Sequence, residues 1–488
     1  MELILYIIDL ATNLINSISD YLYNYILVGW LVVVGIFFSF RFGFVQIKLL
    51  KNALFCIMEK NETGVSSFQA LMISTASRVG TGNIAGVASA IAIGGEGAIF
   101  WMWITAIIGS ASAFIESTLA QIYKIKDKKE GGFIGGPAYY IKNAMKSPKL
   151  ANIFAVILII TYAYGFNGLQ SYNITESFKY YFEKPLLSNI WINIFGVSNE
   201  MSVVIWNILV SIILSVLLGA IIFGGAKRIG KITEILVPVM AIIYIILGIW
   251  IIVLNINKFP IVFMTILKKG LDFKAIAGGA MGTIVVQGIK RGLFSNEAGM
   301  GSAPNAAASA DVSHPVKQGL VQVISVYIDT IIICSVTGFI IVLSNFEGKE
   351  NLKGMSLVQG ALNSQIGEIG IHIITISIFL FAFSSLVGNY FYAEANIKFL
   401  SDKKAVLFVF RLTCIFAVIL GGISSFDLAW GIADVLMVFM TLINLFAIIT
   451  LHPVAKVTLD DYIKKLKDNK ELVFIANNVG VYDTECWK

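Results

Sequence analysis

The sequence is poor in charged residues, in proline and in histidine. Of its 488 residues 14% are charged, 8 are proline and 3 are histidine, whereas 57% are hydrophobic. A typical soluble domain is about 25% charged and about 45–50% apolar. A chain of this length does not build a core large enough to bury so much apolar surface from water. The composition therefore excludes an ordinary soluble domain.

Clusters of metal-ligating or catalytic residues are also missing. The three histidines, His314, His372 and His452, are far apart in the sequence, and the four cysteines are scattered. This distribution indicates neither a disulfide framework nor a metal cluster. Because no group of His, Cys and carboxylate residues has catalytic spacing, we expect no enzyme. The Lys and Arg residues lie in short loops between apolar runs, so we expect no nucleic-acid partner.

Long apolar runs dominate the sequence. A helix of roughly 20 apolar residues spans the hydrocarbon core of a bilayer, and lipid-exposed backbone must satisfy its own hydrogen bonds. We therefore predict an all-α integral membrane protein in contact with lipid. Residues 1–20 mix apolar with polar side chains and are expected to lie along the membrane surface. Eleven transmembrane helices are expected, at residues 24–40, 66–94, 98–123, 150–178, 203–223, 233–255, 273–292, 318–344, 370–397, 404–422 and 425–451.

Basic residues are distributed unequally over the expected loops. Most of the 36 Lys and Arg residues lie in one alternating set of loops, which is 41–60, 124–149, 227–231, 290–317, 398–404 and the segment after His452. Loops rich in Lys and Arg stay on the cytoplasmic side of a membrane. We therefore expect a cell (inner) membrane protein whose N-terminus is outside and whose C-terminus is cytoplasmic.

After the first span, ten helices remain, which divide into two sets of five. This division predicts an N-terminal segment with one extra helix (1–60), a first repeat (61–258), a second, inverted repeat (259–452) and a cytoplasmic tail (453–488). The leading helix of each repeat contains glycines, namely Gly80, Gly82 and Gly86 in the first and Gly278, Gly279 and Gly282 in the second. Glycine-interrupted helices at matching places in inverted halves indicate a substrate site near the bilayer midplane. Alternatively, the glycines are only positions of close helix packing.

An interrupted helix leaves backbone groups that need partners. Each unsatisfied N–H or C=O group costs several kcal/mol in hydrocarbon, and an amino-acid zwitterion with a cation supplies partners for both. Amide groups near Thr81, Gly82 and Asn83 suit a carboxylate. The carbonyl groups that suit Na⁺ and the substrate ammonium are those near Ala76, Val79, Ile276, Gly278 and Gly279.

Several sequence blocks resemble the alanine or glycine:cation symporter family. They are SRVGTGNIAGV at 77–87, GGEGAIFWMW at 94–103, FIESTLAQ at 114–121, GGPAYY at 135–140, KRGLFSNEAGMGSAP at 290–304, YIDT at 327–330 and GNYFYAE at 388–394. Together they are highly specific and extend over residues 66–450. The resemblance implies a LeuT-like fold, that is, a five-plus-five inverted repeat with two broken helices. It also implies Na⁺- or H⁺-coupled uptake of alanine or glycine.

The resemblance further implies individual site residues. Na⁺, the only cofactor expected, would bind the Ala76 and Val79 carbonyls and the hydroxyls of Ser384 and Ser385. The substrate carboxylate would meet the amides of Thr81 and Gly82. Alternatively, the two serines bond back to their own helix.

Gln170 and Asn173 are the candidates that would complete the substrate pocket. They lie three residues apart, and therefore on one face of an otherwise apolar helix. The other interpretation is that they form interhelical hydrogen bonds that contribute about 0.6 kcal/mol each.

Ionisable residues inside the expected spans include Arg78, Glu116 and Asp329. Each costs about 2.5–3.5 kcal/mol on insertion scales, so each should face the interior of the bundle. Arg78 would pair with Glu116 or Asp329, either as a static link between helices or as part of a gate. Glu116 is expected to brace the broken helices by accepting hydrogen bonds from free backbone N–H groups. Because Arg78 stands where the wider LeuT-like pattern has a small residue, one Na⁺ is the minimum expected.

These observations predict a secondary active symporter that couples Na⁺ entry to uptake of a small amino acid, alanine or glycine, by alternating access. The small-residue stretch at 290–304 is expected to form part of the inner closure. An H⁺-coupled or differently selective amino-acid symporter is the alternative. A channel is disfavoured because the sequence shows no repeated filter loop and no ring of charges.

Overall fold

The computed structural model describes residues 2–59, 65–127, 131–272 and 280–487, and these residues are almost entirely helical. The helices up to residue 254 are α1 (Glu2–Leu22), η1 (Tyr23–Leu27), α2 (Val28–Arg41), α3 (Val45–Lys48), α4 (Leu50–Met58), α5 (Ser67–Arg78), η2 (Gly82–Gly86), α6 (Val87–Gly94), α7 (Gly97–Ile122), α8 (Pro137–Asn143), α9 (Pro148–Ile159), η3 (Ile160–Phe166), α10 (Asn167–Phe182), α11 (Pro185–Phe195), α12 (Asn199–Ile222) and α13 (Gly225–Leu254). Two short antiparallel strands, β1 (Ile125–Lys126) and β2 (Phe133–Ile134), pair Ile125 with Ile134.

The second half of the chain has the same character. Its helices are α14 (Phe259–Gly270), α16 (Ala280–Asn296), α17 (Pro304–Ser309), α18 (Pro315–Val326), η4 (Tyr327–Cys334), α19 (Ser335–Leu343), η5 (Lys349–Asn351), α20 (Gly354–Ile366), α21 (Glu368–Leu400), α22 (Lys404–Gly422), α23 (Phe426–Lys467) and η6 (Ala476–Val479). Segments η1 to η4 are π-helical. Such turns inside α-helices are frequent at functional sites.

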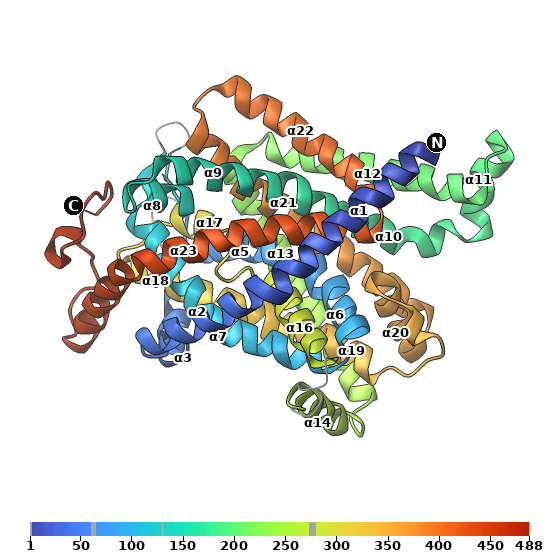
Figure 1. Cartoon of the computed structure of the whole chain (residues 1–488), viewed down its shortest axis with the longest axis horizontal. Helices are drawn as coiled ribbons and strands as arrows, with labels where there is room; N and C mark the ends of the chain where they lie inside the picture. The colour runs from blue at the N-terminus through green and yellow to red at the C-terminus, as the bar shows by residue number, and fades with distance from the viewer. Residues whose placement is uncertain (1, 60–64, 128–130, 273–279, 488) are drawn as a thin grey trace.

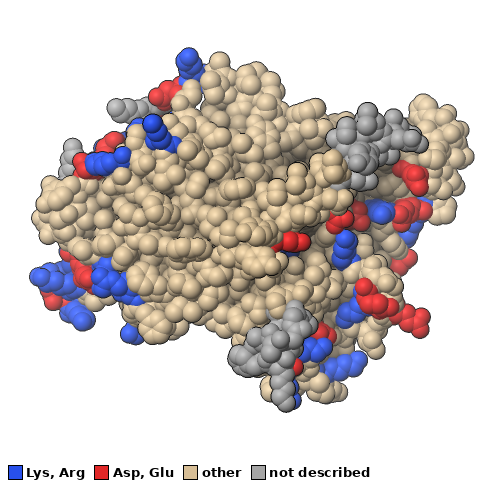
Figure 2. Space-filling view, viewed as in Figure 1, with Lys and Arg blue, Asp and Glu red and all other residues tan. Residues whose placement is uncertain are grey.

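The described helices fit a bilayer by length and by the placement of charge. Nine of them are long and apolar enough to cross a membrane. Long helical stretches such as α9 with η3 and α10, α21 and α23 run roughly along the long axis of the molecule (Figure 1). The visible charged side chains gather toward the ends of that axis and leave a largely uncharged middle (Figure 2). This pattern is that of a multi-pass membrane protein.

The two leading helices of the expected repeats are not among these nine spans. The helix expected at 66–94 is interrupted between Arg78 and Gly82, which leaves α5 on one side and η2 with α6 on the other. The span expected at 273–292 begins in residues that the structure does not describe, and its described part, α16, continues to Asn296.

The expectation that residues 1–20 lie along the membrane surface is wrong. Helix α1 continues through η1 into α2, and the stretch Leu10–Arg41 is long and apolar enough to span a bilayer. Helix α1 packs along α23, as Figure 1 shows. At least one polar side chain of this segment has a partner inside the protein, because Ser19 accepts a hydrogen bond from Lys290 at 3.0 Å.

The basic loop expected at 290–317 begins later than predicted. Lys290 and Arg291 lie inside α16, and both are buried. Lys290 Nζ lies 2.9 Å and Arg291 Nη1 3.1 Å from the Asp434 carboxylate of α23. Arg291 also stacks over the Trp430 ring, 4.2 Å from its centroid. Buried charges of this kind need such partners, and these two cations are therefore not part of a solvated loop.

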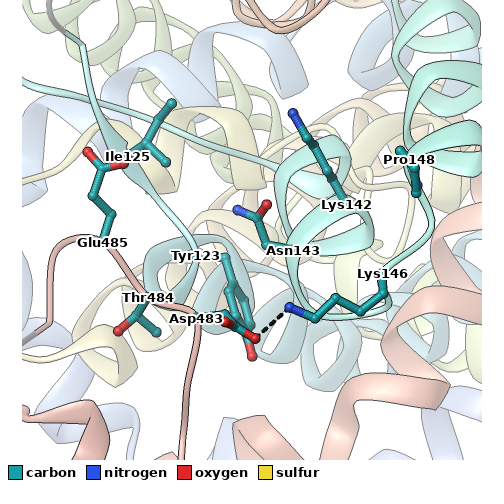
Figure 3. A pocket seen from close by; sticks show the side chains of 9 residues that line it. All are labelled: Tyr123, Ile125, Lys142, Asn143, Lys146, Pro148, Asp483, Thr484 and Glu485. Carbon is teal, nitrogen blue, oxygen red and sulfur yellow. Dashed lines mark hydrogen bonds and ion pairs between the residues drawn. The ribbon is translucent and has the colours of Figure 1, made fainter.

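Residues 468–487 fold back onto the end of α7 and the region before α18. Trp487 Nε1 donates to the Gln121 carbonyl at 2.7 Å, and Phe474 N donates to the Ser313 carbonyl at 2.9 Å. A surface hollow of about 550 Å³ lies beside this segment, with the Lys146–Asp483 ion pair across it (Figure 3). This hollow contains none of the residues predicted for the functional site.

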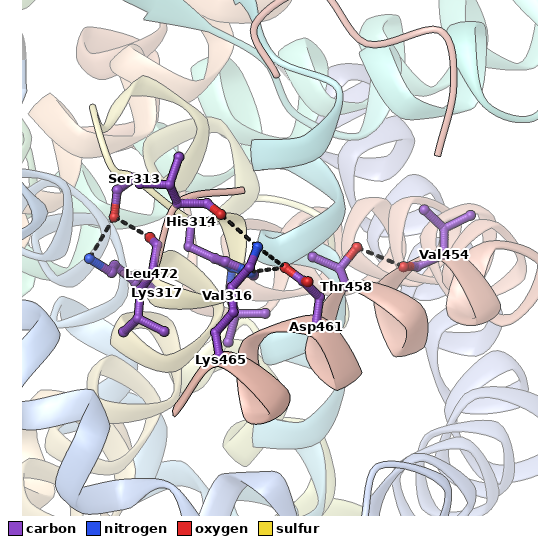
Figure 4. Close-up of polar contacts among 10 residues, drawn as sticks. Ser313, His314, Val316, Lys317, Val454, Thr458, Asp461, Lys465 and Leu472 are labelled. Carbon is purple, nitrogen blue, oxygen red and sulfur yellow. Dashed lines mark hydrogen bonds and ion pairs between the residues drawn. The ribbon is translucent and has the colours of Figure 1, made fainter. Parts of the chain in front are cut away.

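A polar contact joins the start of α18 to α23. His314 Nε2 lies 3.3 Å from Asp461, and Lys465 lies 2.6 Å from the same carboxylate (Figure 4). Burial of the His314 ring lowers its pKa to about 3, although Asp461 opposes this shift. His314 is therefore a neutral, tightly packed residue at neutral pH.

Candidate functional site

The first helix break follows from a start signal and two glycines. Helix α5 begins with a capping box in which Ser66 and Gln69 bond each other's backbone, and it ends at Arg78. A Cβ atom on Gly80 would lie 2.2 Å from Ser385 Oγ, and one on Gly82 would lie 2.7 Å from the Phe294 ring. Only glycine lets the backbone pass this close to α21 and α16. The glycines therefore allow the backbone at the break, residues 79–81, to lie directly against α21 and α16.

The backbone N–H groups of this first break donate hydrogen bonds to side chains. The Gly80 amide donates to Asn83 Oδ1 at 2.9 Å, and the Thr81 amide donates to Gln170 Oε1 at 3.1 Å. The Thr81 hydroxyl is buried and has no hydrogen-bond partner among the described residues. The structure thus brings Gln170 to the amide that the sequence assigned to the substrate carboxylate.

The predicted Na⁺ ligands also come together at the first break. Ser385 Oγ lies 2.9 Å from the Ala76 carbonyl, 3.1 Å from the Ser77 carbonyl and 3.5 Å from the Val79 carbonyl. One hydroxyl proton satisfies only one of these oxygens. The carbonyl oxygens therefore outnumber the protons available to them. Such a group of oxygen atoms can coordinate a cation.

Ser384 contributes less directly to this group of oxygens. Its hydroxyl donates to the carbonyl of Phe381 in its own helix at 2.8 Å, and it lies 3.5 Å from the Ala76 carbonyl. The structure therefore contains both the back-bonded arrangement and the approach to α5 that the sequence left as alternatives.

The second helix break lies at 297–303. The predicted break residues Ile276, Gly278 and Gly279 fall outside the described residues. Gly282, in the same glycine cluster, lies within α16, and no described residue lies within 4 Å of a Cβ added there. The described chain leaves helical geometry after Asn296, where Glu297, Gly299 and Gly301 have φ values of +54°, +85° and +83°.

A buried carboxylate braces this second break. Glu116 of α7 accepts hydrogen bonds from the Gly299 and Gly301 amides at 3.3 and 3.0 Å, and from Asn444 Nδ2 at 2.7 Å. Asn444 also donates to the Gly299 carbonyl at 2.9 Å. These are the contacts expected of Glu116, because the unwound backbone finds its partner in a carboxylate rather than in water.

The ion pair expected for Arg78 is not formed. Arg78 is only 2% exposed, and its Nη1 donates to Gln322 Oε1 at 3.0 Å. The described ion pairs within 4.0 Å join Arg78 to neither Glu116 nor Asp329. The guanidinium nevertheless lies within electrostatic range of both carboxylates. Arg78 is therefore held by its hydrogen bond to the Gln322 side chain and by electrostatic attraction to the two carboxylates.

Asp329 connects the two leading helices. Its Oδ1 accepts a hydrogen bond from Asn83 Nδ2 at 2.6 Å, and its Oδ2 accepts from Ser295 at 2.6 Å and from Thr330 at 2.7 Å. Asn83 belongs to η2 and Ser295 to α16. The Asp329 carboxylate therefore ties the first break to the helix that precedes the second.

Asn173 makes no hydrogen bond to either break in the described part of the chain. Its Nδ2 donates to the Leu169 carbonyl of its own helix at 2.9 Å, and it lines a cleft of about 170 Å³ with Phe426. Aromatic rings lie between this cleft and the first break, because Phe426, Trp430 and Phe294 follow one another with centroid distances of 6.1 and 5.0 Å. The aromatic residues therefore shield the break from that cleft.

Sequence reasoning missed several residues that the structure places at the breaks. Phe294, Ser295 and Glu297 all lie in the block quoted at 290–304, but the block alone does not assign individual contacts. The sequence did not predict a role for Gln322, because a single amide side chain in an apolar helix can have many roles. Asn389, next to Gly388 in a quoted block, accepts a hydrogen bond from Ser77 at 2.7 Å.

Comparison with known proteins places this arrangement in a family. The model of the sodium:alanine symporter family matches residues 8–476. The chain belongs to the sodium:alanine symporter family. Its members are transporters, so the protein is a transporter and not an enzyme.

Curated relatives cover almost the whole chain. The amino-acid carrier protein AlsT of Bacillus subtilis is 44% identical over 98% of this chain and 97% of its own length. The probable sodium/glutamine symporter GlnT of the same organism is 42% identical over 98% and 96%. The sodium/alanine symporter AgcS of Methanococcus maripaludis is 35% identical over 91% and 95%.

A solved structure shows the same fold. The crystal structure of MhsT in complex with L-phenylalanine aligns with a TM-score of 0.54 and 16% identity, over 79% of this chain and 89% of that one. The chain therefore has a LeuT-like fold.

Proposed function

We propose that the protein is a secondary active symporter that couples Na⁺ entry to uptake of alanine or glycine by alternating access. The observation that carries this proposal is the crowding of the Ala76, Ser77 and Val79 carbonyls around the single hydroxyl of Ser385. A Na⁺ ion there would satisfy carbonyls that the broken helix leaves without N–H partners.

The substrate would bind beside this Na⁺, at the first break. Its carboxylate would replace Gln170 Oε1 at the Thr81 amide, a like-for-like exchange of oxygen acceptors. Gly82 and Asn83 would complete that side. Phe294, which contacts Gly82, limits the space to a small side chain. The break at 276–279 that sequence favoured would place Ile276, Gly278 and Gly279 near the substrate ammonium, and that assignment stays a prediction.

We further propose that the N-terminus is outside and the C-terminus cytoplasmic, in the cell membrane. Even when the buried Lys290 and Arg291 are not counted as loop residues, most Lys and Arg residues still lie in one alternating set of loops. With this orientation, a cleft of about 450 Å³ between Gln69 of α5, Asn305 and Ser309 of α17 and Glu394 of α21 lies on the cytoplasmic side. It would be the exit for substrate and ion, and α17 would form part of the inner closure.

Transport into proteoliposomes tests this function. We expect an imposed Na⁺ gradient to drive accumulation of alanine and glycine, and a pH gradient without Na⁺ to drive none. Ser385→Ala should raise the Na⁺ concentration for half-maximal uptake about tenfold or more, which corresponds to about 1.4 kcal/mol. Ser377→Ala is the matched control, because Ser377 is buried in the same helix and donates only to Ile373.

The relative named as a glutamine symporter defines the main competing substrate. A panel of alanine, glycine and glutamine under the same Na⁺ gradient separates the two. Uptake of glutamine without uptake of alanine or glycine would overturn the substrate assignment, and uptake driven only by a proton gradient would overturn the ion.

A further inference from the structure

Residues 468–487 are packed into the protein, although they follow the last long helix. Phe474 and Trp487 are 2% and 7% exposed, and their rings lie 5.6 Å apart between centroids. The Ala476 amide donates to the Trp487 carbonyl at 3.0 Å, which closes the segment on itself. Large buried aromatic side chains fix such a segment through the apolar area that they remove from water. The segment is therefore an ordered part of the protein.

The first part of this segment binds the chain that follows α17. Phe474 N donates to the Ser313 carbonyl at 2.9 Å, and Ser313 Oγ donates to the Leu472 carbonyl at 2.7 Å. The Phe474 ring also packs edge-on against the His314 ring, with 5.1 Å between centroids. Because Ser313 follows α17 closely in the chain, a large movement of α17 would disturb these contacts.

The last part of the segment binds the end of α7 and the β1–β2 hairpin. Trp487 Nε1 donates to the Gln121 carbonyl at 2.7 Å, and the Lys126 amide donates to Glu485 Oε1 at 3.1 Å. The buried Lys124 ammonium lies 5.0 Å from the centroid of a Trp487 ring. Aromatic faces attract cations, so Trp487 both attracts this ammonium and helps to keep water away from it.

Gln121 and Lys124 in turn hold the end of α17. Gln121 Nε2 donates to the Ala307 carbonyl and, at 2.9 Å, to the Ala310 carbonyl. Lys124 Nζ donates to the same Ala310 carbonyl at 2.8 Å. Ala310 also forms a β-bridge with Val65, just before α5. A continuous set of contacts therefore links residues 468–487 to α17 and to the start of α5.

These linked elements are walls of the cleft of about 450 Å³ that is proposed as the exit. Val65 before α5, Phe133 of β2 and Ser309 of α17 all line it. Strand β2 pairs with β1, whose Lys126 amide is bound by Glu485. Wider opening of the cleft requires its walls to separate. Residues 468–487 are bonded to these walls, either directly or through the end of α7.

We propose that residues 468–487 form a latch that holds this cleft narrow and so sets how readily the transporter opens toward the cytoplasm. The inference rests on the proposed function of the cleft as the exit. Release of Trp487 would hydrate the Lys124 ammonium, and water would then compete with the Ala310 carbonyl for it. The contacts between the walls would weaken, and the inward-open arrangement would become more populated.

Alkylation of a cysteine in the cleft measures this opening in the full-length protein. Ser309→Cys places a thiol on the cleft wall, and Cys486→Ser removes the half-buried native thiol but keeps a hydrogen-bond donor at that position. The other native cysteines are buried, namely Cys56, Cys334 and Cys414. The rate of labelling by a polar maleimide is measured on the purified protein without Na⁺ or alanine.

Changes at Trp487 should speed this labelling. Trp487→Ala removes the ring and its N–H donor, and the rate should rise about tenfold. Trp487→Phe keeps a ring but loses the donor, and the rate should rise about threefold. Tyr482→Ala is the matched control, because this tyrosine of the same segment is 67% exposed, and the rate should not change. An unchanged rate in Trp487→Ala, or in Trp487→Phe where the alanine variant does not fold, would overturn the latch.

A second reporter separates opening of the cleft from general loosening of the protein. Ser356→Cys, again with Cys486→Ser, places a thiol in the cleft of about 170 Å³ beside α20, toward the opposite end of the long axis (Figure 1). Trp487→Ala should not speed labelling there. Faster labelling at both positions would overturn the latch. Because the assay uses neither Na⁺ nor alanine, a failed latch leaves the proposed symport standing, and failed symport in proteoliposomes leaves the labelling result standing.

Discussion

The two helix breaks are held by different chemistry. At the first break, the neutral side-chain oxygens of Gln170 and Asn83 accept hydrogen bonds from the free backbone N–H groups. The Ser385 hydroxyl faces the free carbonyls. At the second break, the buried carboxylate of Glu116 accepts two amides, with Asn444 on the intervening carbonyl. A neutral partner is replaced by a ligand at little cost, whereas a buried carboxylate is not. The first break is therefore suited to binding, and the second to bracing.

The largest effect should come from filling the first break. Gly80→Ala places a Cβ 2.2 Å from Ser385 Oγ, so the backbone must move away from the proposed Na⁺ ligands. Overpacking of this kind costs about 1–3 kcal/mol, and we expect Na⁺-driven alanine uptake to fall about 100-fold.

Gly282→Ala is the matched control. Gly282 lies in helix α16, and no described residue lies within 4 Å of a Cβ added there, so uptake should stay at the wild-type level. The opposite result, with Gly282→Ala inactive and Gly80→Ala active, would return the second break to the glycines that sequence favoured.

Removal of the Glu116 charge should be next in size. Glu116→Gln replaces one of the two accepting oxygens by an NH₂ group, so either the Gly299 N–H or the Gly301 N–H is left without its buried acceptor. We expect a loss of about 3 kcal/mol of stability together with weaker transport, measured as thermal unfolding and as uptake at normal expression. Glu96→Gln breaks a partly exposed pair with Lys269 and should cost less than about 1 kcal/mol. Wild-type uptake in Glu116→Gln would show that the second break needs no brace.

A smaller effect should separate Gln170 from Asn173. Gln170→Glu places a carboxylate at the Thr81 amide, where it competes with the substrate carboxylate. The KM for alanine should rise about tenfold. Asn173→Asp alters a side chain that bonds its own helix and should leave KM nearly unchanged. Equal effects in the two variants would contradict the assignment of the pocket to Gln170 alone.

The smallest effect concerns the chain that follows the second break. His314 caps the start of α18, and its pKa is about 3 because the ring is buried. Below the unfolded value of about 6.5, the released histidine binds a proton that the packed one does not. Stability therefore falls as the pH drops from about 6.5 toward 3, by at most about 1.4 kcal/mol per pH unit.

Hydrogen exchange at several pH values measures this effect. After correction for the intrinsic pH dependence of amide exchange, protection at residues 310–314 should fall as the pH drops from 7 to 5.5, and protection at residues 79–81 should not. His314→Gln should remove this loss of protection, and His372→Gln, which changes an exposed histidine, should keep it. Equal pH dependence at both breaks would show that His314 does not distinguish them.

The sequence predicts the first break but not the break at 297–303, for a physical reason. Gly80 and Gly82 interrupt a helix whose start is also visible in the sequence, so local signals suffice. In the second half of the chain, the glycines at 278–282 form a denser cluster than those at 299 and 301. The bend at Glu297 depends on Glu116, which lies 183 residues from Gly299, and local composition does not carry such a contact.

The other predictions also succeeded where the signal is local in the sequence and failed where it depends on distant residues. Most long spans are visible because hydropathy is a local property, and the Ser385 site follows from the family resemblance. The course of α1 was missed because its polar residues meet partners such as Lys290 from a distant helix. The buried Lys290 and Arg291 looked like loop residues because their partner, Asp434, is far along the chain.

An experimental structure of the protein with Na⁺ and L-alanine tests the central claim most directly. The account predicts a cation among the Ala76, Ser77 and Val79 carbonyls and Ser385, and an alanine carboxylate at the Thr81 amide with Gln170 displaced from it. Alanine bound elsewhere, with the Thr81–Gln170 hydrogen bond intact and no cation at Ser385, would contradict the account.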